Sequence, residues 1–311
     1  VINEPTIVAL SLPENAVLAI GKEAKEMIGR TPGDIVAYRP LKDGVVADYY
    51  ITRAMLKYFS NRATGRWNIF KPDLVISAPA GITTTEKRAI TNAAIEAGAK
   101  NAYIVREPLL AALGAGIAIN SSSGNMIVNI GGGTSEVAVI SLGGIVCWSS
   151  LRVAGNHFDG AIINYIKKKY SVSIGEQTAE AAKIAIGTAL PGKEKTEFQI
   201  RGRDLVTGLP KDLIINSNEV AEALNPLLMD IVSSIQGVFN ETPPERVADV
   251  MEKGIILSGG SAGLSNISEF FKRLLGVPTY VAEDAILCVA KGSGIILEHL
   301  DIYKRTLLNK K

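Results

Sequence analysis

The most informative segment of this 311-residue chain reads Met126-Ile-Val-Asn-Ile-Gly-Gly-Gly-Thr-Ser-Glu-Val-Ala-Val-Ile140. An apolar run leads into three glycines and a threonine, and an alternating run follows at once, which predicts two strands joined by a hairpin. Consecutive glycines let backbone N–H groups approach an anion without obstruction by a Cβ, and Thr134 adds a hydroxyl donor. A plain two-residue turn does not need three glycines. The segment therefore favours a phosphate-binding hairpin over a plain tight turn.

A second glycine-rich turn follows another apolar run, in Gly254-Ile-Ile-Leu-Ser-Gly-Gly-Ser-Ala-Gly-Leu264. Glycine turns at strand ends are common in α/β proteins, so this turn alone is weak evidence of function. Two such turns in one chain are better evidence, because each could hold one part of a nucleotide. Neither turn is a P-loop or a dinucleotide fingerprint, since the Lys-Ser/Thr ending and the spaced glycines of a βαβ unit are both missing.

An acidic residue stands where a strand is expected to end and a helix to begin, in Val105-Arg-Glu-Pro108. Pro108 suits the first turn of a helix, which leaves Glu107 at the helix start. There the carboxylate could cap the helix, or it could orient a water for attack on a phosphate. From its position alone, the cap is the better interpretation.

Short apolar runs alternate along the chain with helical segments, which is typical of α/β construction. The expected strands are 74–77, 102–105, 126–130, 136–141, 145–149 and 254–257. A capping side chain followed three residues later by an acid marks the helix starts Thr83/Glu86, Thr242/Glu245 and Asn266/Glu269. Pro243 fits a first helical position, and Gly98 and Gly276 fit left-handed helix exits.

The segment from Lys167 to about Phe239 differs from its surroundings. It reads as mostly helical, and Pro226 interrupts its longest apolar pattern. It lies between the two segments in which a strand leads into a glycine turn. This layout predicts an insertion into one α/β lobe.

The composition excludes several classes of protein. Apolar residues make up 47% of the chain, which excludes disorder, and 33 basic against 31 acidic residues argue against a nucleic-acid partner. The two distant cysteines, Cys147 and Cys288, suit a reducing cytoplasm. The longest apolar run, Leu109–Ile119, is too short to cross a membrane, which takes roughly 18 or more residues.

Further motifs are spread over nearly the whole chain. They are Asn3–Pro5, Gly29–Gly33, Arg39–Asp48, Glu107–Gly116, Ile130–Ser141, Ala161–Tyr165, Gly175–Glu180, Arg201–Arg203, Asn216–Glu219 and Ala282–Asp284. Together with the two glycine turns, these motifs resemble the actin, DnaK-type chaperone and sugar kinase superfamily. Within it, they resemble the MreB family of bacterial actins.

The resemblance implies an α/β, actin-like (ribonuclease H-like) ATPase fold with two lobes around ATP and Mg²⁺. Lobe I is expected over residues 1–118, with a small subdomain IB near 15–37 and a C-terminal helix over 297–311 that returns to it. Subdomain IIA is expected over 119–165 and 240–296, and subdomain IIB over 166–239. The family's first phosphate loop, an Asp-Leu-Gly-Thr hairpin, is expected before Asn3. The chain therefore reads as truncated, with the first strands of lobe I missing.

The resemblance also assigns site residues by motif. Gly131, Gly132, Gly133 and Thr134 match the second phosphate loop, and Gly259, Gly260, Ser261, Ala262 and Gly263 match the adenosine loop. Glu180, Ala181, Ala182 and Lys183 match the segment that contacts the ribose and adenine. Glu107 matches the acid that positions the hydrolytic water, which replaces the cap interpretation. The metal ion is expected to be held through the nucleotide and water, with no direct protein ligand.

Two residues depart from the family pattern. Asn129 stands where the superfamily usually has an aspartate, and an amide lacks the charge that holds water around Mg²⁺. Arg106 replaces the acid that usually precedes Glu107, and a cation there would favour the ionised form of Glu107 or reach a phosphate. Glu107 and Asn129 are the expected catalytic positions, and ATP hydrolysis is expected to be weak.

Three apolar residues, Trp67, Ile69 and Phe70, lie in a connection bounded by glycine and proline. Arg62, Arg66 and Lys71 flank them. In the plain interpretation, the apolar side chains pack under the neighbouring strand. Their position instead resembles the hydrophobic loop by which MreB proteins dip into the bilayer, with basic residues at anionic headgroups.

The resemblance implies a homopolymer of paired protofilaments on the cytoplasmic face of the inner membrane. Its expected partners are further copies of itself and the cell-elongation machinery, such as RodZ, MreC and MreD, with which it organises cell-wall synthesis and determines cell shape. The alternative is a small-molecule kinase of the same superfamily. A kinase needs a catalytic base and polar substrate-binding residues near the cleft, and the sequence offers no such set.

Overall fold

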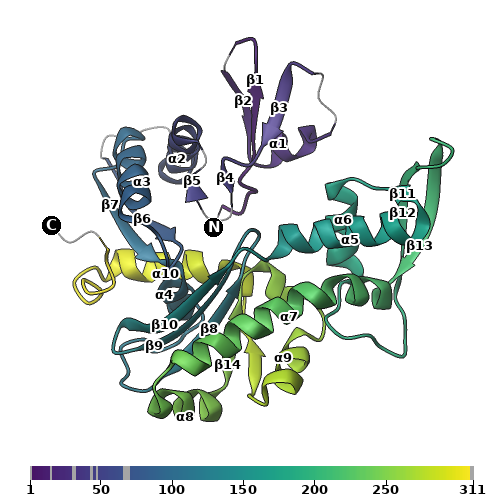
Figure 1. Cartoon of the computed structure of the whole chain (residues 1–311). Helices are drawn as coiled ribbons and strands as arrows, with labels where there is room; N and C mark the ends of the chain where they lie inside the picture. Colours follow the sequence, from purple (N-terminus) through teal and green to yellow (C-terminus); the bar gives the residue numbers. More distant parts are fainter. Residues whose placement is uncertain are drawn as a thin grey trace. The chain divides into compact units, whose positions relative to one another are not determined.

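The computed structural model in Figure 1 describes residues 2–14, 16–29, 33–42, 45–46, 48–65 and 71–308. The chain divides into two compact units: unit 1 contains Val1–Glu107 and Ser293–Lys311, and unit 2 contains Pro108–Gly292. Both units combine strands with helices, as the alternating sequence pattern predicts. No helix in these described ranges is long and apolar enough to pass through a bilayer.

Unit 1 contains a three-stranded antiparallel sheet with a helix on each face. The sheet has the order β2-β1-β3, from β1 (Val8–Ser11), β2 (Ala16–Ile20) and β3 (Ile35–Tyr38), and the helices are α1 (Lys22–Met27) and α2 (Tyr49–Thr64). Because successive side chains of a strand point to opposite faces, β1 serves two small cores. Ala9 packs with Ala24 of α1, whereas Val8 packs with Ile51 and Met55 of α2. The short strands β4 (Leu41–Lys42) and β5 (Val45–Val46) pair with each other.

Two parallel strands form a second layer of unit 1. They are β6 (Asp73–Ala78) and β7 (Asn101–Arg106), connected by α3 (Thr84–Glu96). Their apolar core contains Ala78, Ile90 and Ile104. Both strands confirm the sequence prediction to within one residue at each end.

Unit 2 is built around a five-stranded sheet. Across the sheet the strands are β10 (Gly144–Leu151), β9 (Ser135–Ser141), β8 (Asn125–Ile130), β14 (Ile255–Ser258) and β15 (Thr279–Val281). The first three are antiparallel neighbours, whereas β8, β14 and β15 run parallel. The helices of unit 2, of which α4 and α10 cross its boundary with unit 1 in sequence, are α4 (Glu107–Gly114), α5 (Gly155–Tyr170), α6 (Glu176–Ile186), α7 (Ser217–Glu241), α8 (Pro244–Lys253), η1 (Gly260–Gly263), α9 (Ile267–Leu275), η2 (Ala285–Leu287) and α10 (Cys288–Glu298).

Three helices share one core with the sheet of unit 2. Val128 and Val137 of the sheet are fully buried in the same apolar cluster as Phe158 of α5, Leu228 of α7 and Phe271 of α9. Alternate residues of β8 and β9 therefore face these helices, and the residues between them face the opposite side of the sheet.

The segment from Lys167 to about Phe239 is mostly helical, as expected, since α5, α6 and α7 cover just over half of it, but its strands were not predicted. It contains a three-stranded antiparallel sheet of β11 (Val172–Ser173), β12 (Glu197–Asp204) and β13 (Pro210–Asn216). Apolar and polar residues alternate through Phe198-Gln-Ile-Arg201, and this period of two belongs to a strand.

Pro226 does not interrupt a helix, because α7 runs through it as one helix of 25 residues. Proline removes one N–H and so frees the carbonyl of the residue four positions earlier. Pro226 and Glu222 are both exposed, and water can therefore satisfy that carbonyl.

The capping box predicted at Thr83 is confirmed: its hydroxyl accepts from the N–H of Glu86, whose carboxylate accepts from the N–H of Thr83. The side-chain cap predicted at Asn266 is wrong. Asn266 has a left-handed backbone, with φ of 60°, and its amide donates to Thr188 Oγ1 at 3.1 Å instead of capping α9. A tertiary partner competes successfully with the local cap.

The helix start predicted at Thr242 is wrong by one residue. Thr242 Oγ1 donates back to Val238 O at 2.6 Å, so Thr242 belongs to the end of α7. Pro243 precedes α8, and Pro244 takes the first helical position. Either Pro243 or Pro244 could occupy the first position of the helix. Because Thr242 is buried and bonded to α7 through Val238 O, the helix begins at Pro244.

The C-terminal helix expected over 297–311 is also wrong, because α10 ends at Glu298 and residues 299–306 form turns. The reason is a strand-like contact within unit 1. Leu307 forms a bridge with Val105 of β7, and Leu308 N–H donates to Ile104 O at 2.9 Å. This pairing needs an extended backbone, which a helix cannot supply.

Candidate functional site

Two glycine-rich turns lie next to each other at one edge of the sheet in unit 2. In the adjacent parallel strands β8 and β14, Asn129 pairs with Ser258, so the carboxyl ends of both strands reach the same edge. The turns that follow are joined directly, because Ser261 Oγ donates to Gly131 O at 2.9 Å. The tertiary structure therefore brings together two turns that are more than a hundred residues apart in sequence.

The start of α5 holds the first turn in place. The N–H groups of Gly155 and Asn156 donate to the carbonyl oxygens of Gly131 and Gly132, at 3.1 and 2.8 Å. Within the turn, Gly131 N–H donates to Thr134 O at 3.0 Å. Sequence reasoning missed this role of the α5 start, although the Gly-Asn pair at a helix start was a visible signal.

Gly259 is the position at which the second turn depends on glycine. Its φ of 88° lies in a region that residues with a side chain rarely adopt. A Cβ at this position would lie 2.3 Å from Ile130 O and 3.0 Å from Asn129 Oδ1. The missing side chain therefore lets the second turn approach the end of β8 closely.

The helix α6 supplies a mostly buried cation beside these turns. Lys183 Nζ donates to Gly155 O at 2.9 Å and forms an ion pair with Asp159 Oδ1 at 2.8 Å. Both side chains are largely covered, at 13% and 9% exposure, so this pair is protected from solvent screening. Asp159 was missed by sequence reasoning, because its partner lies on another helix.

The other three residues assigned to the ribose and adenine differ in exposure. Glu180 is half-buried and Ala181 is exposed, whereas Ala182 is fully buried in the apolar core of unit 2. Ala182 therefore packs α6 against its neighbours. The helical spacing places Glu180 and Lys183 on one face of α6.

The segment after α6 is attached to the end of the second turn. Ala189 N–H donates to Ser265 O at 2.8 Å, and Ser265 N–H donates to Gly187 O at 3.1 Å. Thr188 Oγ1 also donates to Ser265 O, at 3.2 Å. The predicted adenosine loop and the predicted ribose-contacting helix are thus fixed to one another.

A row of polar residues crosses four strands next to the turns. Ser150, Glu136, Asn129 and Ser258 occupy directly opposed positions on β10, β9, β8 and β14. Glu136 and Ser258 are fully buried, and Asn129 is 2% exposed. Ser150 Oγ donates to Glu136 Oε1, and Ser258 Oγ donates to Asn129 Oδ1 at 2.9 Å. Sequence reasoning named Asn129 but missed Glu136, whose signal was a single acid within an apolar strand.

The donor atoms of this region suit a magnesium ion carried by a nucleotide. Mg²⁺ prefers oxygen donors and keeps several of its waters. Glu136, Asn129 and Thr134 provide carboxylate, amide and hydroxyl oxygens at the glycine hairpin between β8 and β9. The residues present therefore fit a hydrated Mg²⁺.

Glu107 is placed on a different part of the fold. It is the first residue of α4 and the last residue of unit 1, whereas both glycine turns belong to unit 2. Arg106 is the last residue of β7. The roles of these two residues toward a nucleotide stay predictions. Trp67, Ile69 and Phe70 lie outside the described residues.

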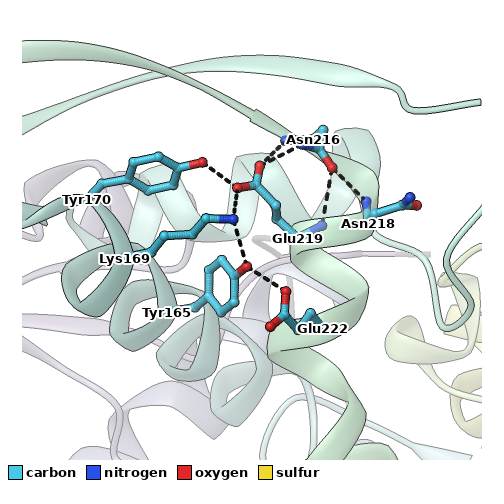
Figure 2. Close-up of polar contacts among 7 residues, drawn as sticks. All are labelled: Tyr165, Lys169, Tyr170, Asn216, Asn218, Glu219 and Glu222. Atoms are coloured by element: carbon cyan, nitrogen blue, oxygen red, sulfur yellow. Dashed lines mark hydrogen bonds and ion pairs between the residues drawn. The ribbon is translucent and has the colours of Figure 1, made fainter.

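A charged network ties the C-terminal end of α5 to the start of α7 (Figure 2). Lys169 Nζ lies 2.7 Å from Glu219 Oε1, and the Tyr170 hydroxyl donates to the same oxygen. Asn216 N–H donates to the other carboxylate oxygen of Glu219 at 2.8 Å, which completes the capping box of α7. The Tyr165 hydroxyl donates to Glu222 at 2.7 Å.

The network changes the acidity of its members. Burial opposes ionisation of Glu219, but hydrogen bonds from Lys169, Tyr170 and the Asn216 backbone outweigh it and lower the pKa of Glu219. Bonding to this carboxylate raises the pKa of Lys169 and of Tyr170. The helix α5 therefore contacts the glycine hairpin at one end and is anchored by an ionised carboxylate at the other.

A family model, a sequence relative and a solved structure each match nearly the whole chain. The family model described as MreB/Mbl protein matches residues 1–305. The cell shape-determining protein Mbl of Bacillus cereus is 49% identical over 308 residues, which cover 99% of this chain and 92% of that protein. The crystal structure of MreB5 of Spiroplasma citri bound to ADP has a TM-score of 0.92 at 39% identity, and the match covers 98% of this chain and 91% of that one.

A more distant structure supports the fold alone. The double helical filament of MamK has a TM-score of 0.80 at 23% identity, and the match covers 95% of this chain and 91% of that one. These likenesses confirm the predicted α/β, actin-like fold. Because the family model matches residues 1–305 and a relative that is 49% identical covers 99% of this chain, the chain belongs to the MreB/Mbl protein family.

Proposed function

We propose that this chain is an actin-like cytoskeletal protein with a role in cell shape, which binds an adenine nucleotide and assembles into filaments. The observation that carries the proposal is the direct bond between the two glycine turns, from Ser261 Oγ to Gly131 O at 2.9 Å. Backbone N–H groups at such turns are suited to phosphate oxygens. The similar MreB5 was crystallised with ADP, and MamK was solved as a filament.

The residue roles follow the motif assignments. Gly131–Thr134 would bind phosphates, Gly259–Gly263 would lie at the adenosine, and Glu180 and Lys183 would approach the ribose. Lys183 is already fixed by Gly155 O and Asp159, which favours a preorganised position. Bound Mg²⁺ would neutralise phosphate charge. Glu107 would orient the attacking water, and we expect hydrolysis to be slow, since Asn129 and Arg106 change the charge of the site.

The proposal keeps the subdomain assignment inferred from the family. Lobe I would comprise 1–118 and the C-terminal segment, subdomain IIA 119–165 and 240–296, and subdomain IIB 166–239. The small-molecule kinase is not favoured, because the curated relatives are cell shape-determining proteins.

The direct test is negative-stain electron microscopy of the purified chain on a lipid monolayer, with ATP and without nucleotide. We expect ordered filaments with ATP and few or none without it. A chain that binds ATP but stays monomeric at all concentrations, and phosphorylates a small-molecule acceptor, would contradict the proposal in favour of the kinase.

We also propose that the filaments lie on the cytoplasmic face of the inner membrane, held by Trp67, Ile69 and Phe70, and act there with elongation proteins such as RodZ, MreC and MreD. The support is the sequence pattern of three apolar residues flanked by basic ones. Full burial of each apolar side chain yields roughly 1.5–3 kcal/mol, reduced by ordering costs, so a single subunit would bind weakly. A filament presents many such loops and would bind tightly.

Changing all three residues to serine (W67S, I69S and F70S together) is expected to abolish co-sedimentation of filaments with liposomes of anionic lipid. Filament formation in solution should persist, because the change leaves the nucleotide site intact. Exchange of Lys71 for glutamine serves as a milder control that retains the apolar residues. Unchanged sedimentation of the triple variant would disprove the membrane contact.

A further inference from the structure

We propose that the tip of the β12–β13 hairpin, defined as residues 204–209, is a second lipid-contacting surface of this chain, which inserts apolar side chains into a bilayer with anionic headgroups. The proposal rests on the membrane location proposed above for the filaments. It adds a contact within unit 2 to the one proposed for Trp67, Ile69 and Phe70. The hairpin lies at the end of α5, well away from the five-stranded sheet of the same unit (Figure 1).

Three apolar side chains face solvent at the tip. Val206 is 84% exposed, Leu209 is 65% exposed and Leu205 is 43% exposed. A single exposed apolar residue is ordinary on a protein surface, but three within five positions form a contiguous apolar patch. The two residues between them, Thr207 and Gly208, carry no charge. The tip therefore presents a compact apolar surface.

The shape of the tip is fixed by its own hydrogen bonds. Asp204 Oδ1 accepts from the N–H groups of Val206 and Thr207, at 2.8 and 3.0 Å. Across the turn, Asp204 N–H donates to Leu209 O and Gly208 N–H donates to Asp204 O, both at 2.9 Å. A surface that is ordered before it binds loses less conformational entropy on binding. The apolar side chains are thus held on a preordered backbone.

The acid of the tip carries no net charge to the surface, because a lysine neutralises it. Lys211 Nζ lies 2.9 Å from Asp204 Oδ2. The hydrogen bond from Lys211, with those from the N–H groups of Thr207 and Val206, lowers the pKa of Asp204 to about 2. Further along the hairpin, Asp212 is paired in the same way with Arg201, at 2.6 Å.

The surroundings of the tip have an excess of positive charge. Leu205 N–H donates to Ser171 O at 2.8 Å, so the tip lies beside the end of α5, where Lys167 and Lys168 are exposed. Arg203, the residue before the tip aspartate, is also exposed. Within the part of the chain that the structure describes, these three cations form no ion pair, whereas the neighbouring Lys169 is paired with the carboxylate at the start of α7.

This combination of charge and apolar surface favours a lipid bilayer as the partner. Apolar side chains that enter the acyl boundary, with cations that meet anionic headgroups, are the two components of interfacial membrane binding. A second copy of this chain is the other candidate, but its formal charge of +2 provides no excess of acid to meet three further cations. One tip binds weakly, and a filament that presents many tips multiplies the effect.

The experiment measures the lipid concentration at which half of the full chain co-sediments with vesicles in the presence of ATP. Vesicles of phosphatidylglycerol and phosphatidylcholine in equal parts are compared with vesicles of phosphatidylcholine alone. Changing the three apolar residues together (L205S, V206S and L209S) is expected to raise this concentration about tenfold on the anionic vesicles. K167Q/K168Q is expected to raise it about tenfold on the anionic vesicles and to leave the value for phosphatidylcholine alone unchanged.

I214S is the matched control. Ile214 is an exposed apolar residue of β13, and it lies on the same hairpin but outside the tip. The lipid concentration for half binding should therefore stay at its original value in I214S. An equal rise in I214S and in the triple serine variant would show that general loss of apolar surface, and not the tip, is responsible, which contradicts the inference.

A single variant, V206D, avoids any doubt about folding, because a substitution at so exposed a position changes stability little. We expect it to weaken binding to the anionic vesicles at least as much as the triple change, while its thermal midpoint stays unchanged. Unchanged lipid binding in V206D and in the triple variant overturns the inference.

Electron microscopy without lipid separates the two candidate partners. We expect V206D to form filaments with ATP in solution. Loss of these filaments in a folded V206D chain would assign the tip to a contact between copies and overturn the lipid inference. If the original chain forms filaments but does not sediment with anionic vesicles, the proposed membrane location fails as well. If the original chain sediments and the tip variants sediment equally, only the tip inference fails.

Discussion

Replacing Gly259 with alanine is expected to destabilise unit 2 strongly and to prevent nucleotide binding. The new Cβ would lie 2.3 Å from Ile130 O, which is backbone and cannot move aside without disturbing β8. The φ of 88° adds strain, since residues with a side chain rarely adopt it. Backbone strain and overpacking each cost about 1–3 kcal/mol, so a total near 4 kcal/mol is expected. For a unit of this size, that lowers the thermal midpoint by roughly 8–16 °C.

Thermal unfolding followed by circular dichroism measures this effect. Gly263→Ala is the matched control within the same turn, because nothing lies within 4 Å of a Cβ there. We expect its midpoint to shift by less than roughly 2 °C, as is usual for a substitution that meets no contact. Equal midpoints for the two variants would show that the close approach of Gly259 to the end of β8 has no energetic importance.

Replacing Glu219 with alanine is expected to have the second largest effect. It removes the acceptor of four donor groups at once: those of Lys169 and Tyr170, and both the backbone N–H and the side-chain amide of Asn216. Lys169 can reach water, because its side chain is 46% exposed, so the main loss is at the tyrosine and at the helix start. Losing hydrogen bonds to a charged acceptor and a helix cap is expected to cost about 2–3 kcal/mol.

Urea unfolding measures this loss, and Glu222→Ala is the control. Glu222 lies one turn further along α7, is exposed, and accepts from the Tyr165 hydroxyl (Figure 2). Its removal should cost no more than about 1 kcal/mol. If E219A and E222A unfold at the same urea concentration, the network does not depend on the buried carboxylate.

The pH dependence of the Glu219 contribution has a definite sign. Because folding lowers the pKa of Glu219, its contribution is present above the unfolded value of 4.5 and is lost as the pH falls toward the folded value. The stability difference between the original chain and E219Q should therefore shrink below about pH 4.5. A difference that stays constant down to pH 3 would contradict the lowered pKa.

The fold was predictable wherever short-range pattern and local chemistry agree. The strands around the glycine hairpin and the capping box at Thr83 are indicated by residue types within a few positions of each other. The strands between α6 and α7 were harder to predict, because the alternating pattern in β12 covers few residues and long helical patterns flank it in the sequence. Asn266 and Thr242 have good capping side chains, yet each bonds to a residue outside its expected helix start.

In the candidate site, too, some residues could be predicted from the local sequence and others only from the tertiary structure. Gly131–Thr134 could be named from its three adjacent glycines, whereas Gly259–Gly263 was assigned through the family resemblance, because a glycine turn at a strand end is common in α/β proteins. Asp159 could not be named, since only the packing of α6 beside α5 places Lys183 within 2.8 Å of it. Glu136 was inconspicuous for a similar reason, because its opposition to Asn129 depends on the register between two strands.

The sequence by itself determined the α/β class, the two glycine turns and the family, because these depend on residue types at short spacing. Only the tertiary structure decided that the turns share one sheet edge, that α5 spans from the hairpin to Glu219, and that a buried carboxylate opposes Asn129. The physical reason is that strand order, strand register and helix packing join residues far apart in the chain. Such contacts leave no pattern in the nearby sequence, because the residues on either side of a position do not indicate which distant residue it will contact.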